Sequence, residues 1–327
     1  MISRRHVIIA LGAAALAAPL RSVAQARKVW RIGFLWEIER PDYIRRFDVF
    51  KAGMSALGYA EGRDYVIEVR SAQSDPSQLP RLAVELVALH VDLIVPGGTP
   101  SAIAASRATR EIPILIATVG DPVGSGLVAS MAHPGKNVTG LTSLSTELVT
   151  KRLDLLRQLL PQIHRVGLLY DPTNPNDAPS APQFESDCVK FHFQSILAPA
   201  RNADEIAASF EKLASHKAEG LIVATGNTNT AALDEIVRYV AKQRLPAIYG
   251  LSIYPEAGGL ISYAADYSDL FRRAATYADK IFRGARAGDL AIEQPVKFDF
   301  VINVKAAKAL GIEIPLSILL QATQVIE

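Results

Sequence analysis

Two glycine-bearing turns stand where a ligand site could be built. They read PGGTPSA at 96–102 and GDPVGSG at 120–126. Each directly follows an apolar run, VDLIV at 91–95 and IPILIATV at 112–119. This order is typical of the turn between a buried strand and a helix. Because open parallel sheets bind ligands outside the carboxyl ends of their strands, we expect both turns to face one site.

The first turn carries groups that suit an anion. Gly97 and Gly98 allow close approach to the backbone, Thr99 adds a hydroxyl, and a helix N-terminus favours negative charge. A carboxylate fits better than a nucleotide, because neither turn has the GxxxxGK[ST] spacing and no GxGxxG follows the first strand. The alternative is that the two glycines only permit a tight turn.

Two acidic residues near these turns have two interpretations each. Asp121, followed by Pro122, could accept a hydrogen bond from an amine or hydroxyl of the ligand, or could cap a helix. Asp266 ends the extended run at 258–266 and is the better candidate for an ammonium partner. Its alternative is again a cap, for the helix that begins near Ser268.

Aromatic and amide side chains are further candidates for the site. The rings near predicted strand ends are Trp36, Tyr170, Tyr249, Tyr254 and Tyr263. A flat apolar ligand could stack on such rings while the turns take its polar groups. Each ring alone is equally typical of a core. Asn174, in the proline-rich polar loop at 171–182, is expected to reach the ligand as well.

The sequence offers no convincing catalytic set. It contains no HExxH and no GxSxG, and its single cysteine, Cys188, excludes an intrachain disulfide and a CxxC motif. His192 would neighbour Cys188 on one helix and could activate a thiolate, but a buried, inert cysteine is the favoured interpretation. Basic and aromatic residues are not interleaved as in nucleic-acid binders. We therefore expect a binding protein without cofactor or metal, and not an enzyme.

Alternation of strand-like and helical runs predicts the fold class. From Val29 onward, apolar runs alternate with amphipathic helices, which is typical of parallel sheets covered on both faces. The alternation restarts near Thr146, and 327 residues are enough for two cores. This predicts an α/β protein with two doubly wound, Rossmann-like lobes. The extended runs at 258–266 and 297–303 and the helix between them come after both units, so they are candidates for chain that crosses between lobes.

The N-terminus is typical of an export signal. A basic start, with Arg4 and Arg5, leads into an apolar stretch at 7–20 and a small-residue ending at Ala26. The stretch is shorter than the roughly 18 residues that span a bilayer. The arginine pair resembles a twin-arginine signal, with an ordinary signal as the alternative. Without residues 1–26 the formal charge of +2 falls by three arginines to −1, and we expect a soluble periplasmic protein.

Long segments of the chain together resemble one known family. They include GYAEGRDYVIEVR, DLIVPGGTPSAIAA, GDPVGSGLVASMAHPGKNVTG, PEAGGLISYAADYSDLFRRAATYADKIFRGA and QPVKFDFVINVKAAKALGIEIP. In this order they are similar to the ABC transporter substrate-binding proteins related to tryptophan and tyrosine binders. The resemblance covers nearly all of the chain after residue 26.

The resemblance implies a type I periplasmic binding protein with three crossover segments. The expected lobes are 27–142 plus about 263–295, and 143–262 plus about 296–327. The cleft-facing positions that it implies are Gly98, Thr99, Asp121, Pro122, Thr225, Gly226, Asn227 and Tyr263 to Asp266. We expect a monomer that captures a small solute by lobe closure and works transiently with a permease and an ATPase.

One departure bears on the ligand. The amino-acid-binding branch has an acidic residue soon after the segment matching NVTG, where this chain has Leu141 and Leu144. The expected ligand is therefore an aromatic or branched amino acid or carboxylic acid, with an α-ammonium group left open. Two rival functions use the same architecture: a periplasmic sensor for a membrane receptor, and an exported enzyme with Asp121 or Cys188 in a chemical role.

Overall fold

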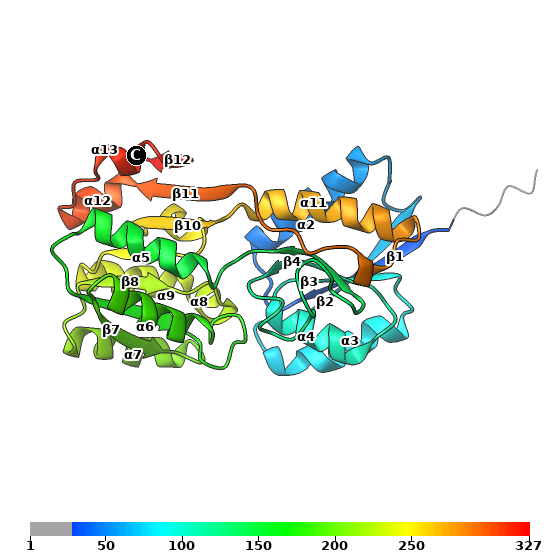
Figure 1. Cartoon of the computed structure of the whole chain (residues 1–327), viewed down its shortest axis with the longest axis horizontal. Helices are drawn as coiled ribbons and strands as arrows, with labels where there is room; N and C mark the ends of the chain where they lie inside the picture. Colours follow the sequence, from blue (N-terminus) through cyan, green and yellow to red (C-terminus); the bar gives the residue numbers. More distant parts are fainter. Residues whose placement is uncertain (1–27) are drawn as a thin grey trace, which may run out of the picture.

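Two α/β lobes lie side by side along the long axis of the molecule (Figure 1). The computed structural model describes residues 28–327, so the predicted export signal at 1–26 lies outside the described residues. One lobe has a five-stranded sheet in the order β2-β1-β3-β4-β5. The other has a seven-stranded sheet in the order β12-β11-β10-β9-β8-β6-β7. The predicted α/β class with two Rossmann-like lobes is confirmed.

The first lobe, called the N-lobe, has an entirely parallel sheet. Its strands β3, β4 and β5 are buried along their whole length, as helices on both sides of a sheet require, whereas the edge strand β2 is only partly buried. Its elements are β1 (Trp30–Trp36), α2 (Pro41–Ala56), β2 (Tyr65–Ser71), η1 (Pro76–Gln78), α3 (Leu79–Ala88), β3 (Leu93–Pro96), α4 (Thr99–Ala108), β4 (Ile114–Val119), β5 (Val138–Thr142), α11 (Tyr267–Phe282) and η2 (Ala287–Asp289).

The second lobe, called the C-lobe, has one antiparallel pair, β10 with β11, in an otherwise parallel sheet. Its elements are α5 (Leu148–Leu159), β6 (Arg165–Tyr170), α6 (Ser180–Lys190), β7 (Gln194–Pro199), α7 (Asp204–Ser215), β8 (Gly220–Val223), α8 (Asn227–Ala231), α9 (Leu233–Gln243), β9 (Ala247–Tyr249), α10 (Ile253–Glu256), β10 (Ile261–Ala265), β11 (Phe298–Asn303), α12 (Val304–Leu310), α13 (Leu316–Leu319) and β12 (Gln324–Ile326).

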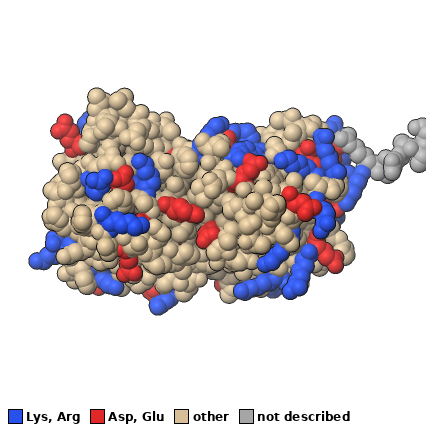
Figure 2. All heavy atoms as spheres, viewed as in Figure 1, with Lys and Arg blue, Asp and Glu red and all other residues tan. Residues whose placement is uncertain are grey.

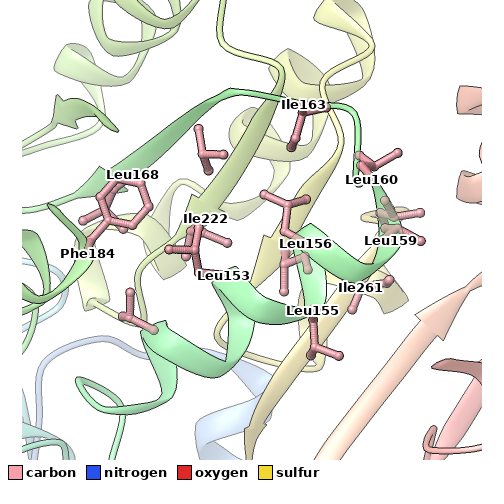
Figure 3. Close-up of a cluster of buried hydrophobic side chains, with 14 of the residues drawn as sticks. Leu153, Leu155, Leu156, Leu159, Leu160, Ile163, Leu168, Phe184, Ile222 and Ile261 are labelled. Atoms are coloured by element: carbon pink, nitrogen blue, oxygen red, sulfur yellow. The ribbon is translucent and has the colours of Figure 1, made fainter. Parts of the chain in front are cut away.

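Helix α5 is anchored to the C-lobe sheet by its apolar face. Leu153 and Leu156 are fully buried and belong to one cluster with Ile222 of β8 and Ile261 of β10 (Figure 3). Their spacing of three residues places both side chains on the same side of the helix. Because Arg152 precedes Leu153 on this rigid helix, its position near the lobe junction is fixed as well.

Helix α11 returns the chain to the N-lobe and packs against α2 (Figure 1). Gly53 lets the helices approach, because a Cβ there would lie 2.9 Å from the carbonyl oxygen of Arg272. The chain passes between lobes after β5, between β10 and α11, and between α11 and β11. Since β10 pairs within the C-lobe sheet up to Ala265, the return to the N-lobe begins at Asp266, a few residues after the expected position near 263.

The surface carries both signs of charge. Lysine, arginine and acidic side chains are interspersed over both lobes on the face shown in Figure 2. Across residues 28–327, every helix is too short or too polar to span a bilayer. A search of the same residues finds no group of three or more histidine, cysteine or acidic side chains placed to hold a metal ion.

Candidate functional site

A small polar cavity lies at the junction of the two lobes, at the carboxyl ends of strands from both sheets. Its volume is about 20 Å³, close to the space of a single water molecule. Six residues predicted from the sequence line it: Gly98, Thr99, Asn174, Thr225, Gly226 and Asn227. Four further polar side chains line it that the sequence did not single out: Arg46, Thr118, Asn176 and Tyr267.

The N-lobe wall of the cavity is the turn between β3 and α4. Behind this turn lie Trp36 and Glu37, and a Cβ on Gly97 would overlap the Trp36 ring. Glu37 is buried and its Oε1 accepts a hydrogen bond from the Ser101 backbone N–H at 2.9 Å. Burial raises the pKa of Glu37. The glycines are thus needed for packing, which is the tight-turn alternative, while Thr99 at the helix start faces the cavity.

The C-lobe wall is the turn between β8 and α8. A Cβ on Gly226 would overlap Oδ2 of Asp177, so this carboxylate lies directly behind the cavity lining. Asp177 is fully buried, and burial raises its pKa to about 7. The Thr225 Oγ1 atom is buried and has no hydrogen-bond partner among the described residues. A polar atom in this state is available to a ligand.

Arg46 and Tyr267 contribute to the cavity from helices α2 and α11. The Arg46 guanidinium lies over the Tyr267 ring, 4.6 Å from its centroid. Burial raises the pKa of Tyr267, whereas the nearby charge of Arg46 opposes this shift. The pair places a cation and a phenol at the side of the junction formed by the N-lobe helices.

Arg152 of α5 connects the first crossing segment to strand β10. Its Nε donates a hydrogen bond to the Tyr263 carbonyl at 2.9 Å, and its Nη1 donates to the Ser145 carbonyl at 3.4 Å. The side chain is fully buried, and burial lowers its pKa to about 10. Its Nη2 has no hydrogen-bond partner among the described residues. Arg152 therefore connects the first crossing segment, at Ser145, to strand β10 of the C-lobe sheet.

The two acidic residues singled out from the sequence act within their own turns. Asp121 Oδ1 accepts a hydrogen bond from the Gly124 N–H at 2.7 Å, and Pro122 is buried in the same turn. Asp266 is the N-cap of α11 and accepts from the Asp269 N–H at 2.9 Å. None of these residues lines the cavity. The helix-cap alternative holds for Asp266, whereas no helix is assigned after Asp121, whose carboxylate stabilises a turn instead.

The aromatic residues of the predicted site also lie outside the cavity lining. Trp36 stacks on Phe271 in the N-lobe core, with ring centroids 6.1 Å apart. Tyr170 is buried in the C-lobe core, and the Tyr263 ring stacks on Phe298. Strand residues alternate between the two faces of a sheet, and these rings pack against side chains of their own lobe instead of pointing into the cavity.

A larger cavity, of about 950 Å³, lies at the far end of the N-lobe. Residues from the start of β1 and the end of α11 line it, including Trp30, Lys136 and Arg286. It is at the amino ends of the strands, where the loops of a doubly wound sheet do not form ligand sites. The small cavity at the junction is the better candidate in spite of its size.

The fold and the site define a class of protein. Two Rossmann-like lobes, joined by three crossing segments and meeting at a polar cavity, are the architecture of a type I periplasmic substrate-binding protein. Residues 31–326 match the family described as "ABC transporter substrate binding protein". The chain belongs to this family, and the resemblance stated from the sequence is confirmed.

Three relatives are informative about this chain. It is 26% identical over 288 residues to a tyrosine-binding protein of Clostridioides difficile (strain R20291). The match covers 88% of this chain and 83% of that protein. A Streptococcus pneumoniae ABC domain in complex with L-Trp is 26% identical and has a TM-score of 0.85, with 91% and 100% coverage. The ligand-free, open structure of a Clostridium difficile substrate binding protein with adhesive properties is 27% identical, with a TM-score of 0.69 and 91% and 99% coverage.

These relatives are solute-binding proteins and not enzymes, as was expected for this chain. The match extends over nearly the whole described region, so both lobes and all three crossing segments are included. The chain is accordingly a substrate-binding protein of an ABC transporter, and its solute is a small molecule.

Proposed function

We propose that this chain is the periplasmic component of an ABC importer and captures an aromatic or branched amino acid, or a related carboxylic acid, between its lobes. The observation that carries the proposal is the convergence of strand-end turns from both lobes on one cavity. Thr99 comes from one side, and Thr225 and Asn227 from the other. A solute held there contacts both lobes, so its binding energy favours their closure.

The arrangement of the lobes supports closure as part of the function. A volume of about 20 Å³ cannot hold an amino acid, since pockets for small molecules are roughly 300 Å³ or more. The lobes must therefore separate to admit the solute. At equal coverage, the structure superposes better on the L-Trp complex than on the ligand-free, open structure, with TM-scores of 0.85 and 0.69.

The chemistry of the walls supports an amino acid or an organic acid. The names of the relatives mention tyrosine and L-Trp. Hydroxyl groups of Thr99 and Thr225 can donate to a carboxylate, and the start of α4 adds favourable partial charge. We propose Asp177 as the partner of an α-ammonium group, because it is the carboxylate directly behind Gly226. An ammonium brought beside it would stabilise its ionised form.

The proposed location follows from the N-terminal sequence. Residues 1–26 have the composition of an export signal, and we propose that it is removed near Ala26. The solute-loaded chain then delivers its ligand to a membrane permease powered by an ATPase. The chain is proposed to act as a monomer.

A thermal-shift screen tests the function. The purified protein is heated with each proteinogenic amino acid and with 3-phenylpropionate and indole-3-propionate. A compound that binds only the folded state raises the melting temperature, and the stabilisation grows with the logarithm of one plus its concentration over Kd. We expect a shift with at least one aromatic or branched compound, and its loss in Thr99→Ala and Thr225→Ala. The matched control is Asp121→Ala, whose carboxylate bonds only within its own turn and whose shift should remain.

A further inference from the structure

The side chain of Asn176 bridges the two lobes through one oxygen atom. Its Oδ1 accepts hydrogen bonds from Thr99 Oγ1 at 3.2 Å, from the Gly120 N–H at 3.1 Å and from Ser145 Oγ at 3.1 Å. Thr99 and Gly120 belong to the N-lobe, and Ser145 lies on the first crossing segment. Asn176 itself belongs to the C-lobe loop between β6 and α6. One acceptor thus collects three donors from outside its own lobe.

Contacts within the C-lobe hold the Asn176 carboxamide in this orientation. Its backbone N–H donates to Asn174 Oδ1 at 2.9 Å, and its Nδ2 donates to Asp177 Oδ1 at 3.4 Å. The amide nitrogen is therefore turned toward the C-lobe and the oxygen toward the N-lobe. Gly120 permits the approach, because a Cβ there would overlap both Asn176 Oδ1 and Ser145 Oγ.

Three donors converging on one point suit an anionic oxygen better than an amide oxygen. A carbonyl oxygen has two lone pairs, so three donors exceed its ordinary capacity. A carboxylate oxygen carries negative charge and forms hydrogen bonds about twice as strong as those of a neutral acceptor. One of the donors, Thr99, is at the first position of α4, where the helix N-terminus favours negative charge.

We infer that Asn176 is an internal latch: its carboxamide oxygen closes the lobes by occupying the donors that receive a carboxylate oxygen of the solute. The latch itself rests on the observed contacts, whereas its competition with a solute rests on the proposed function. The solute must displace Asn176 to reach Thr99 and the Gly120 N–H. A protein that is competent to bind for only a fraction of the time has an apparent affinity reduced by that fraction.

Small-angle X-ray scattering in solute-free buffer tests the latch. Asn176→Ala removes the bridging oxygen, and Asn176→Ser keeps a polar side chain too short to reach the N-lobe. Both variants are expected to have a larger radius of gyration than the wild type. Thr173→Ala is the control, because Thr173 lies exposed in the same loop and its hydroxyl donates only to Asp171. A radius unchanged in both Asn176 variants overturns the latch.

Titration calorimetry tests the competition. L-tyrosine, L-tryptophan and 3-phenylpropionate are the carboxylate probes, and tyramine is the matched probe without a carboxylate. We expect Asn176→Ala to bind the acids on the order of tenfold more tightly, equivalent to about 1.4 kcal/mol. Tyramine should bind at least tenfold more weakly than tyrosine. Unchanged or weaker acid binding in the variant, or equal binding of tyramine and tyrosine, overturns the competition.

The two experiments separate this inference from the proposed function. If none of the acids binds any variant, the proposed solute class is wrong, while the scattering result still decides whether Asn176 closes the lobes. If the acids bind the wild type and scattering shows no opening in the Asn176 variants, the solute class survives and the latch does not.

Discussion

The Nε atom of Arg152 donates a hydrogen bond to the carbonyl oxygen of Tyr263 across 111 residues of sequence, at 2.9 Å. Tyr263 lies on β10, close to where the chain leaves the C-lobe for α11, and Ser145, the second acceptor of Arg152, lies on the first crossing segment. One buried guanidinium therefore connects the first crossing segment to β10, just before the second crossing segment begins at Asp266. Loss of this contact is therefore expected to lower the stability of the C-lobe and to loosen the chain where it crosses between the lobes.

Substituting Arg152 tests this role. Arg152→Met keeps most of the side-chain volume but leaves two buried carbonyl oxygens without their donor, which costs about 1–3 kcal/mol for each unsatisfied group. We expect a melting temperature lowered by several degrees and a broader distribution of lobe separations in solution. Arg157→Met on the same helix is the control, since its guanidinium is exposed. Equal melting temperatures for the two variants would contradict the assignment.

Gly226 is expected to tolerate no side chain while Asp177 is present. Its backbone is extended, so alanine carries no conformational penalty there, but its Cβ would overlap Asp177 Oδ2. Gly226→Ala should destabilise the protein by about 1–3 kcal/mol, as overpacking does. In an Asp177→Ala background the same change should cost much less. A double-mutant cycle on melting temperatures measures the coupling, and additive effects would rule out the contact.

Asp177 should make stability depend on pH between about 4 and 7. Burial raises its pKa from 3.8 to about 7 in the folded state, and the hydrogen bond from the Asp171 backbone N–H and the charge of Arg152 oppose this shift. In that window the folded carboxyl keeps a proton that the unfolded chain has lost, so its contribution to stability falls as pH rises. Above pH 7 both states are ionised and the decline ends.

Melting curves from pH 4.5 to 8 for the wild type and Asp177→Asn isolate this effect. Asp299, whose pKa is raised to about 6 by burial, contributes in the same direction to both proteins and cancels in the comparison. The wild type should lose stability relative to the variant as pH rises toward 7. Parallel curves would show that Asp177 titrates near its ordinary pKa.

Asp266 is expected to matter for stability and not for solute affinity. Its carboxylate caps α11 through the Asp269 N–H, and removing such a cap costs typically about 1 kcal/mol. Asp266→Ala should therefore lower the melting temperature while the Kd for the best solute of the screen stays within twofold. A large loss of affinity without a loss of stability would restore Asp266 as a ligand contact.

The sequence indicates where in the fold the candidate site lies better than it indicates which side chains line it. Strand-end logic predicts Gly98 and Thr99, because apolar runs followed by glycines indicate where buried strands end, and the family resemblance adds the Thr225 turn; these residues line the junction cavity. The rings were placed less well, since periodicity does not say which face of a strand meets solvent. Tyr170 is in the core for this reason.

Three important polar residues gave weak signals in the sequence. Arg152 is an ordinary position on an amphipathic helix, and its partners lie on other segments. Asp177 and Asn176 are in the proline-rich segment at 171–182, whose turn-forming residues predict irregular structure but do not indicate which side chains make contacts. Their roles depend on contacts with residues as distant as Thr99, and single-sequence patterns do not report such contacts.

A crystal structure of the protein with the tightest compound of the thermal-shift screen tests the central claim most directly. We predict that the compound lies between the lobes. One of its carboxylate oxygens should be within hydrogen-bond distance of Thr99 Oγ1 and the Gly120 N–H, and the Asn176 side chain should be displaced from these donors. A compound bound instead in the large cavity beside Trp30 and Arg286, with the junction unchanged, would contradict the account.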